Sequence, residues 1–344
     1  MKKWCLILCS TWWLTACQSV NYYGQSIKGQ WQILANRQPL EQVIKHPQSS
    51  PALIKQLQSI QKIRHFAQSL SLPTKGQYDT YVDIKRSAAM WSVAATPELS
   101  LTAKTWCYWG VGCLGYRSFF EETLAQQFES QLKEQGYDTH LSRVTAYSTL
   151  GWFRDSVLSN FVYKSEADLA ELIFHELAHQ VVYAKNDPVF NESFAEVVAD
   201  EALKRYLVGR MEQFDNIVLR KKRQQQFAEL VLDYRKQLAD IYKSNLTIPE
   251  KRQKKAQTFE SLQQSYQQLK QQQWQGFNGY DAWFAHLSNA KLNSVSVYNS
   301  LIPALTQLLL SVDYDLPRFY QQCQKLAKLS VTERHKILAT QDTK

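Results

Sequence analysis

The stretch from residue 166 to residue 185 constrains the fold most, because its apolar side chains recur with the period of an α-helix. A stripe this apolar is stable only when it packs against other elements, so we expect a helix in the protein core. The polar residues before Pro188 should end it, and a second helical pattern runs from about residue 191 towards residue 207. The apolar positions of the first helix are Ala170, Ile173, Phe174, Leu177, Ala178 and Val181.

The same helix carries two histidines, His175 and His179, with Glu176 directly after the first. Residues four positions apart lie one above the other on a helix, so both imidazoles can reach one Zn²⁺ at about 2.0–2.1 Å. In this pattern the glutamate is the catalytic residue that acts on a metal-bound water. Two histidines that merely line a polar cleft are the simpler alternative. A chance match to the pattern in a chain of this length has odds of roughly one in a hundred.

A third metal ligand is predicted at Glu192, near the start of the second helix, from where its side chain can turn back towards the histidines. Two histidines and one glutamate leave a fourth position open for water, which is typical of a catalytic zinc site. Glu196 lies one turn further on the same face and could accept the outer ring N–H of either histidine. The sequence therefore predicts one Zn²⁺ ion held by His175, His179 and Glu192.

The rest of the chain predicts an α+β protein that is mainly helical. Extended runs are expected between residues 78 and 97 and at residues 143–149, and a more apolar helical block at residues 289–310. Thr247 and Glu250 match a capping box that would start the second of two long helices. The predicted segments are a signal peptide (1–16), an N-terminal helical segment (17–75), a core (76–210), a basic helical hairpin (211–275) and a C-terminal helical part of the core (276–344).

The first residues have the layout of a secretory signal, with Lys2 and Lys3 before a short apolar run and small residues. Residues 14–17 resemble a bacterial lipobox, in which Cys17 would be acylated and become the first residue. An ordinary signal with a chance cysteine is the alternative. Gln18 resembles the pattern sorted to the outer membrane, so we expect an envelope lipoprotein facing the periplasm.

The net charge and the cysteines limit which partners and which compartment fit the chain. Lys plus Arg number 40 against 31 acids, a net charge of +9, and without residues 1–16 the count is 38 against 31, or +7. This basic body favours anionic lipid or acidic polymers, and no nucleic-acid-binding signature accompanies it. No stretch of eighteen apolar residues lies in the body, which excludes a multi-pass membrane protein. Export favours a disulfide between Cys107 and Cys113, and two reduced thiols are the alternative. Cys323 should be a buried apolar residue.

Several blocks of residues resemble known families. His175, Glu176 and His179, followed by Asn191, Glu192, Phe194 and Ala195, are similar to the gluzincin pattern of thermolysin-like proteases and zinc aminopeptidases, although the spacing to Glu192 is shorter than in thermolysin. A closer resemblance is to a family of bacterial lipoproteins described as predicted zinc aminopeptidases, and it spans nearly the whole mature chain. The blocks that carry it are residues 93–98, 106–117, 146–153, 174–180 and 190–195, together with the lipobox.

This resemblance implies a zincin-like metallopeptidase domain acting on peptides near a free N-terminus. The candidates for a donor to the developing oxyanion are Tyr298, His286 and Tyr147, and those for the acid that binds the substrate amine are Glu98 and Asp155. Residues 143–149 could pair with a peptide backbone as an edge strand, or be an ordinary edge strand.

The rival interpretation is a non-catalytic binding or assembly lipoprotein with a structural or vestigial metal site, in which the basic hairpin docks a partner. Glu176 argues against it, because a structural site would not need that residue. The sequence identifies no protein partner and no oligomeric state.

Overall fold

The computed structural model describes residues 22–108, 112–145, 154–295 and 300–340 of the chain. It is mainly helical with three small sheets, an α+β arrangement. The chain forms two compact units. We call the first the sheet unit (Met1–Arg37, Ile84–Thr145 and Leu232–Ser294) and the second the helical unit (Gln38–Asp83, Ala146–Val231 and Val295–Lys344). The predicted core segment, residues 76–210, contributes to both units.

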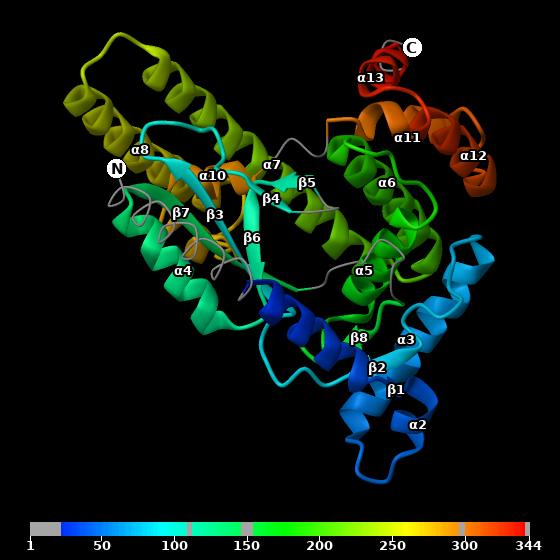
Figure 1. The fold of residues 1–344 in the computed structure, drawn as a ribbon. Coiled ribbons are helices and arrows are strands. Elements are labelled where there is room, and N and C mark those ends of the chain that lie inside the picture. The colour runs from blue at the N-terminus through cyan, green and yellow to red at the C-terminus, as the bar shows by residue number, and fades with distance from the viewer. Residues whose placement is uncertain (1–21, 109–111, 146–153, 296–299, 341–344) are drawn as a thin grey trace, which may run out of the picture. The chain divides into compact units, whose positions relative to one another are not determined.

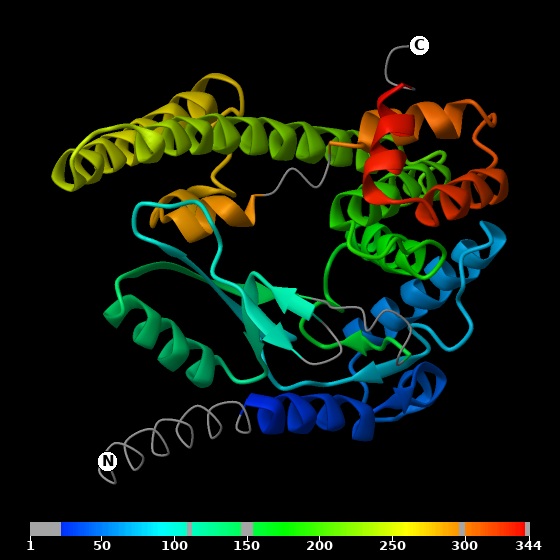
Figure 2. The same cartoon turned by 45° about the horizontal axis from the view of Figure 1, so that its top comes forward.

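An antiparallel sheet of order β6-β3-β7 forms the centre of the sheet unit. Its strands are β3 (Met90–Pro97), β6 (Tyr116–Phe119) and β7 (Tyr137–Val144). Alternate residues of β3, namely Trp91, Val93 and Ala95, are buried in a cluster with Ala125 and Leu132 of α4 (Glu122–Glu134). Figure 2 shows α4 on one face of this sheet and α10 (Asn289–Ser294) on the other. Both faces are therefore covered, as the buried, largely apolar sequence of β3 requires.

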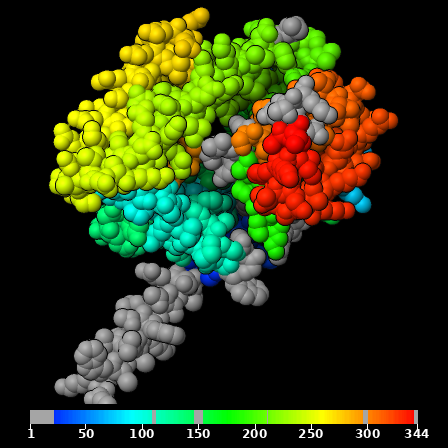
Figure 3. All heavy atoms as spheres, turned by 90° about the horizontal axis from the view of Figure 1, so that it is seen from above, coloured from blue at the N-terminus to red at the C-terminus, as the bar shows by residue number. Residues whose placement is uncertain are grey.

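Two long helices complete much of the sheet unit: the C-terminal part of α7 (Met211–Lys243) and α8 (Ile248–Gln272). They lie side by side, with the Tyr234 hydroxyl 2.7 Å from the Ser265 hydroxyl, and Figure 3 shows their adjoining surfaces in yellow-green and yellow. The Thr247 side chain accepts the Glu250 N–H while the Glu250 carboxylate accepts the Thr247 N–H, so the expected capping box starts α8. The remaining elements of the sheet unit are a helix at residues 22–35, β4 (Trp106–Tyr108), β5 (Gly112–Leu114) and α9 (Asp281–Phe284).

The helical unit packs helices around a buried helix α5 (Figure 1). Helix α5 (Glu166–His179) contacts α6 (Pro188–Tyr206) and α3 (Pro51–Ser69), and α11 (Ile302–Leu310) covers α6. A small mixed sheet of order β1-β2-β8 precedes α5. The other elements are β1 (Gln38–Pro39), α2 (Leu40–Lys45), β2 (Thr80–Val82), β8 (Val157–Leu158), α12 (Leu316–Ala327) and α13 (Val331–Ala339).

The predicted end of the first core helix and the predicted start of the second were wrong. Helix α5 ends at His179 rather than near residue 185, and α6 begins at Pro188 rather than near residue 191. The side chain of Asn191 binds the backbone N–H and carbonyl of Ala184 at 2.7 and 2.9 Å, which holds residues 180–187 against α6 as a loop. Proline is also favourable at the first position of a helix, where its missing N–H costs nothing.

The strand predicted from residue 143 begins earlier: β7 runs from Tyr137 to Val144, and residues 146–149 of the prediction lie outside the described residues. Gly136 adopts a left-handed backbone (φ 80°) that turns the chain out of α4 early enough for β7 to pair along the whole of β3. The predicted block at residues 289–310 is two helices, α10 and α11. Within the described ranges, no helix combines the length and the apolar character needed to cross a bilayer.

Candidate metal centre

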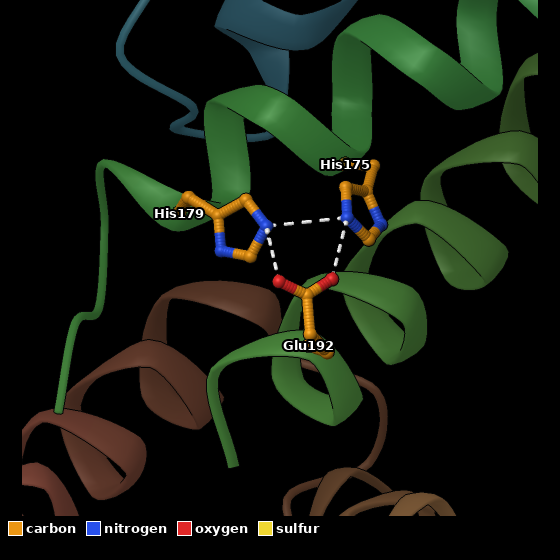
Figure 4. A group of neighbouring side chains, drawn as sticks. All are labelled: His175, His179 and Glu192. Carbon is orange, nitrogen blue, oxygen red and sulfur yellow. Dashed lines mark hydrogen bonds and ion pairs between the residues drawn. The ribbon is translucent and has the colours of Figure 1, made fainter. Parts of the chain in front are cut away.

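Three side chains from α5 and α6 converge on one point (Figure 4). The Nε2 atoms of His175 and His179 lie 3.2 Å apart. One carboxylate oxygen of Glu192 is 3.4 Å from Nε2 of His175, and the other is 3.6 Å from Nε2 of His179. The sequence-predicted ligand set is thus brought together by two helices of the same unit.

These separations fit a divalent ion of the size of zinc. Ligand atoms about 2.0–2.1 Å from a tetrahedral zinc ion lie about 3.3 Å from one another. The two Nε2 atoms have this separation, and a different carboxylate oxygen of Glu192 faces each of them at 3.4 and 3.6 Å. Two imidazole nitrogens and a carboxylate oxygen are also donors that zinc prefers. The geometry and the chemistry of the three side chains therefore suit one metal ion.

Packing of α5 explains why its histidines point towards α6. Ile173, Phe174 and Leu177 are fully buried, and the Phe174 ring contacts the rings of Phe66 in α3 and Tyr206 in α6. With this face fixed in the core, the histidines occupy the flank next to α6.

The start of α6 is fixed as firmly. The Asp187 side chain accepts the Phe190 N–H at 3.1 Å and also pairs with the buried guanidinium of Arg334. Asn191, bonded to Ala184, directly precedes Glu192. The position of Glu192 is thus set by the cap of its own helix.

A second carboxylate, that of Glu196, supports His175 from the other side of its ring. Oε2 of Glu196 lies 3.6 Å from Nδ1 of His175, and Oε1 accepts a hydrogen bond of 2.8 Å from the ammonium group of Lys221. Burial would raise the pKa of Glu196, but its bonds to His175 and Lys221 lower it to about 2. Glu196, which the sequence predicted as an acceptor for the outer ring N–H of a histidine, is therefore ionised at neutral pH.

Lys221 is a residue that sequence reasoning missed. Its ammonium also bonds Asp200 and lies 3.2 Å from Glu171, so it joins three acids, Glu171, Glu196 and Asp200. These acids are close enough together to hold an ion, but an ammonium group already lies among them. The only sequence signal was a basic run, which is more often a solvated face.

Glu176 lies in a different environment from the three ligands. Burial raises its pKa to about 7, with further contributions from the negative charges of Asp155 and Glu192 and an opposing one from His175. A carboxyl group with this pKa can both accept and release a proton near neutral pH.

Tyr78 was expected only as a strand residue, yet it belongs to this region. Its phenol is buried, and its pKa is raised well above the usual value by burial and by the charges of Glu176 and Asp155. Its backbone N–H donates to the carbonyl of Asp155 at 2.7 Å. No local pattern in the sequence marks this residue as part of a site.

The two histidines have opposite pKa shifts. Burial lowers the pKa of His175, but the Glu192 and Glu196 carboxylates raise it to about 10. Burial and the neighbouring charge of His175 lower the pKa of His179. The pocket thus favours one positive charge at the point where a metal ion would lie.

The other predicted residues are distributed more widely. Asp155 is buried in the helical unit, and Gln180 donates to its carboxylate at 3.4 Å. Glu98 belongs to the sheet unit and forms a two-bond pair with Arg252 at 2.7 and 2.8 Å, so its carboxylate already has a partner. His286 is an exposed residue of the sheet unit. The predicted Tyr147, Tyr298 and Cys17 lie outside the described residues.

The cysteines of the body are placed as follows. Cys107 and Cys113 are joined by a disulfide across the β4–β5 hairpin. Cys323 is a buried free thiol in α12, as expected from its helical pattern.

The fold and the convergent site define a mainly helical α+β protein that could hold a metal ion. Residues 21–338 match the sequence pattern of a family described as "Putative aminopeptidase". The match covers most of the chain, so the protein belongs to this family. No curated protein and no solved structure matches it.

Proposed function

We propose that the protein is a zinc-dependent aminopeptidase with a zincin-like catalytic domain, anchored by a lipid on Cys17 in the bacterial envelope, most specifically at the outer membrane facing the periplasm. The family supports peptidase chemistry. The observation that carries the metal-dependent mechanism is the convergence of His175, His179 and Glu192 beside a glutamate whose pKa is near neutral.

Zn²⁺ bound by these three residues would lower the pKa of a coordinated water towards about 7 and polarise the carbonyl of the scissile peptide bond. Glu176 accepts a proton from the attacking water and then delivers it to the departing amine nitrogen, so the carboxylate ends each cycle unchanged. A group that performs both transfers needs a pKa near the working pH, which burial supplies.

Recognition of a free N-terminus needs an anion close to the reacting carbonyl. Of the two sequence candidates, Asp155 is in the same unit as the metal ligands, and its charge acts on Glu176. Glu98 is paired with Arg252. We therefore assign amine binding to Asp155.

The test uses peptides with a free or an acetylated N-terminus, together with zinc analysis of the purified protein. Wild-type protein should contain zinc and release the first residue of free peptides only. Glu176→Gln should keep zinc and lose about 10²–10⁴-fold in kcat, because the general base is removed. Asp155→Asn should raise KM for free peptides more than it lowers kcat.

Contrary results would redirect the assignment. If neither wild type nor Glu176→Gln cleaves any peptide, and the variant keeps zinc and every measurable function of the wild type, the enzymatic mechanism is wrong and a binding or assembly role is favoured. If blocked peptides are cleaved internally, the protein is an endopeptidase with the same metal chemistry.

A further inference from the structure

The helix at residues 22–35 is fixed to the sheet unit along one face. Gly29 is the contact point, because a Cβ atom there would lie 2.1 Å from the ring of Phe120. The Gln25 side chain accepts the Phe120 N–H at 2.9 Å, and Ile33 is buried. The helix therefore has a defined inner face and a defined outer face.

The outer face is apolar where solvent would favour polar residues. Ile27 and Trp31 are 70% and 68% exposed, and Tyr23, whose ring also meets the ring of Tyr108, is 43% exposed. They follow one another every four residues, so they form one stripe about 12 Å long on the helix surface. A contiguous exposed stripe of apolar side chains marks an interaction surface rather than a solvated one.

The sequence before the helix indicates what covers this stripe. Cys17, the proposed acylation site, precedes Tyr23 by six residues. Six residues span at most about 20–22 Å even when fully extended. A lipid on Cys17 would therefore keep the stripe within about that distance of the bilayer surface.

We propose that Tyr23, Ile27 and Trp31 form a membrane-docking stripe, with which the helix at residues 22–35 lies in the interface of the bilayer that holds the Cys17 lipid. The inference rests on the lipid anchor of the proposed function. Tyrosine and tryptophan suit this depth, because an apolar ring and a polar tip can meet acyl chains and headgroups together.

The size of the stripe distinguishes a membrane from a second copy of the chain. A stable protein interface buries about 800 Å² on each partner. Three side chains of one helix expose far less area than this to solvent. For a membrane such a small stripe is sufficient, because the lipid supplies the attachment and the stripe only sets the orientation of the sheet unit.

Flotation of the mature chain carrying Cys17→Ser tests the stripe separately from the lipid. Vesicles of phosphatidylethanolamine and phosphatidylglycerol should bind this unacylated protein weakly but measurably. The double change Ile27→Ser and Trp31→Ser should weaken partitioning about tenfold or more. Ile248→Ser is the matched control, since Ile248 is a 52% exposed isoleucine of the same unit, and it should leave partitioning unchanged.

Depth is measured with brominated acyl chains, which quench only tryptophans that reach them. Wild-type fluorescence should be quenched, and Trp31→Phe should lose that quenching while still binding vesicles. The proposal would be overturned if the Cys17→Ser protein did not float with vesicles, or if it floated equally well with and without the Ile27→Ser and Trp31→Ser changes. It would also be overturned if the protein formed a dimer that these two changes disrupt and Ile248→Ser does not. Failure of the anchor itself is seen separately, as unchanged membrane sedimentation of full-length Cys17→Ser in cells.

Discussion

Glu98 in the sheet unit and Glu192 in the helical unit are neutralised by different kinds of partner. Glu98 meets the permanent cation of Arg252, and nearby Asp138 meets Lys255 at 2.7 Å. Glu192 pairs with two histidines, His175 and His179, each of which has a neutral form. The first arrangement is electrically complete with protein groups alone, whereas the second is completed by a proton or a metal ion.

This difference separates structural charge clusters from a site that can exchange its cation. Glu196 stands between the two cases, because it touches His175 on one side and the ammonium of Lys221 on the other. The ammonium of Lys221 keeps Glu196 ionised and holds it beside His175. Replacing fixed cations, first in the helical unit and then in the sheet unit, tests this difference.

The largest effect is expected for Lys221→Met, which removes the fixed cation behind Glu196. Changes in such supporting partners lower metal affinity by about ten- to a hundredfold, so zinc should dissociate that much more readily. Competition with a chromophoric chelator measures the dissociation constant. Arg220→Met is the matched control, because Arg220 is the neighbouring residue and bonds Glu171 at 2.6 Å, whereas the ammonium that bonds Glu196 is that of Lys221. Equal affinities for the two variants would show that Lys221 does not position the site.

A graded effect is expected from pH. The raised pKa of His175 means that the metal-free site keeps its proton at neutral pH, and zinc must displace that proton to bind. Zinc affinity should therefore fall as pH falls, by about tenfold for each unit between about pH 8 and pH 6. Calorimetry in buffers of different ionisation enthalpy measures the released proton. An affinity independent of pH over this range would contradict a protonated His175 in the free site.

The smallest effect is expected for Arg252→Met in the sheet unit. Exposed ion pairs contribute little to stability, so the thermal midpoint should fall only slightly. Zinc affinity and peptidase activity should stay within about twofold of wild type, since Glu98 is not assigned to the site. A large rise in KM for free peptides would instead return Glu98 to the role of amine-binding residue.

Much of the candidate metal centre could be predicted from the sequence because helix geometry fixes it locally. His175 and His179 are one turn apart in α5, and Glu192 lies near the start of α6. Their convergence therefore needs only that these two consecutive helices pack together. Lys221 and Tyr78 could not be selected in this way. Lys221 lies 25 positions from Glu196 in the chain, and Tyr78 lies about 100 positions from Glu176. Packing that no local pattern encodes brings both of them to the site.

The fold was predictable to a similar degree. The helical character and the capping box at Thr247 follow from local residue patterns. The end of α5 and the extent of β7 do not, because they depend on the bonds of Asn191 to Ala184 and on pairing with β3. Tertiary contacts decided these boundaries against local propensity.

Zinc stoichiometry of wild-type protein and of Glu192→Gln tests the central claim most directly. Elemental analysis after dialysis against a weak chelator should give one zinc ion per wild-type chain. The Glu192→Gln variant should keep its fold by circular dichroism and lose most of its zinc, because a carboxylate ligand has become a neutral amide. A wild-type chain without zinc, or a variant that binds it equally well, would contradict the convergence of these three side chains on one metal ion.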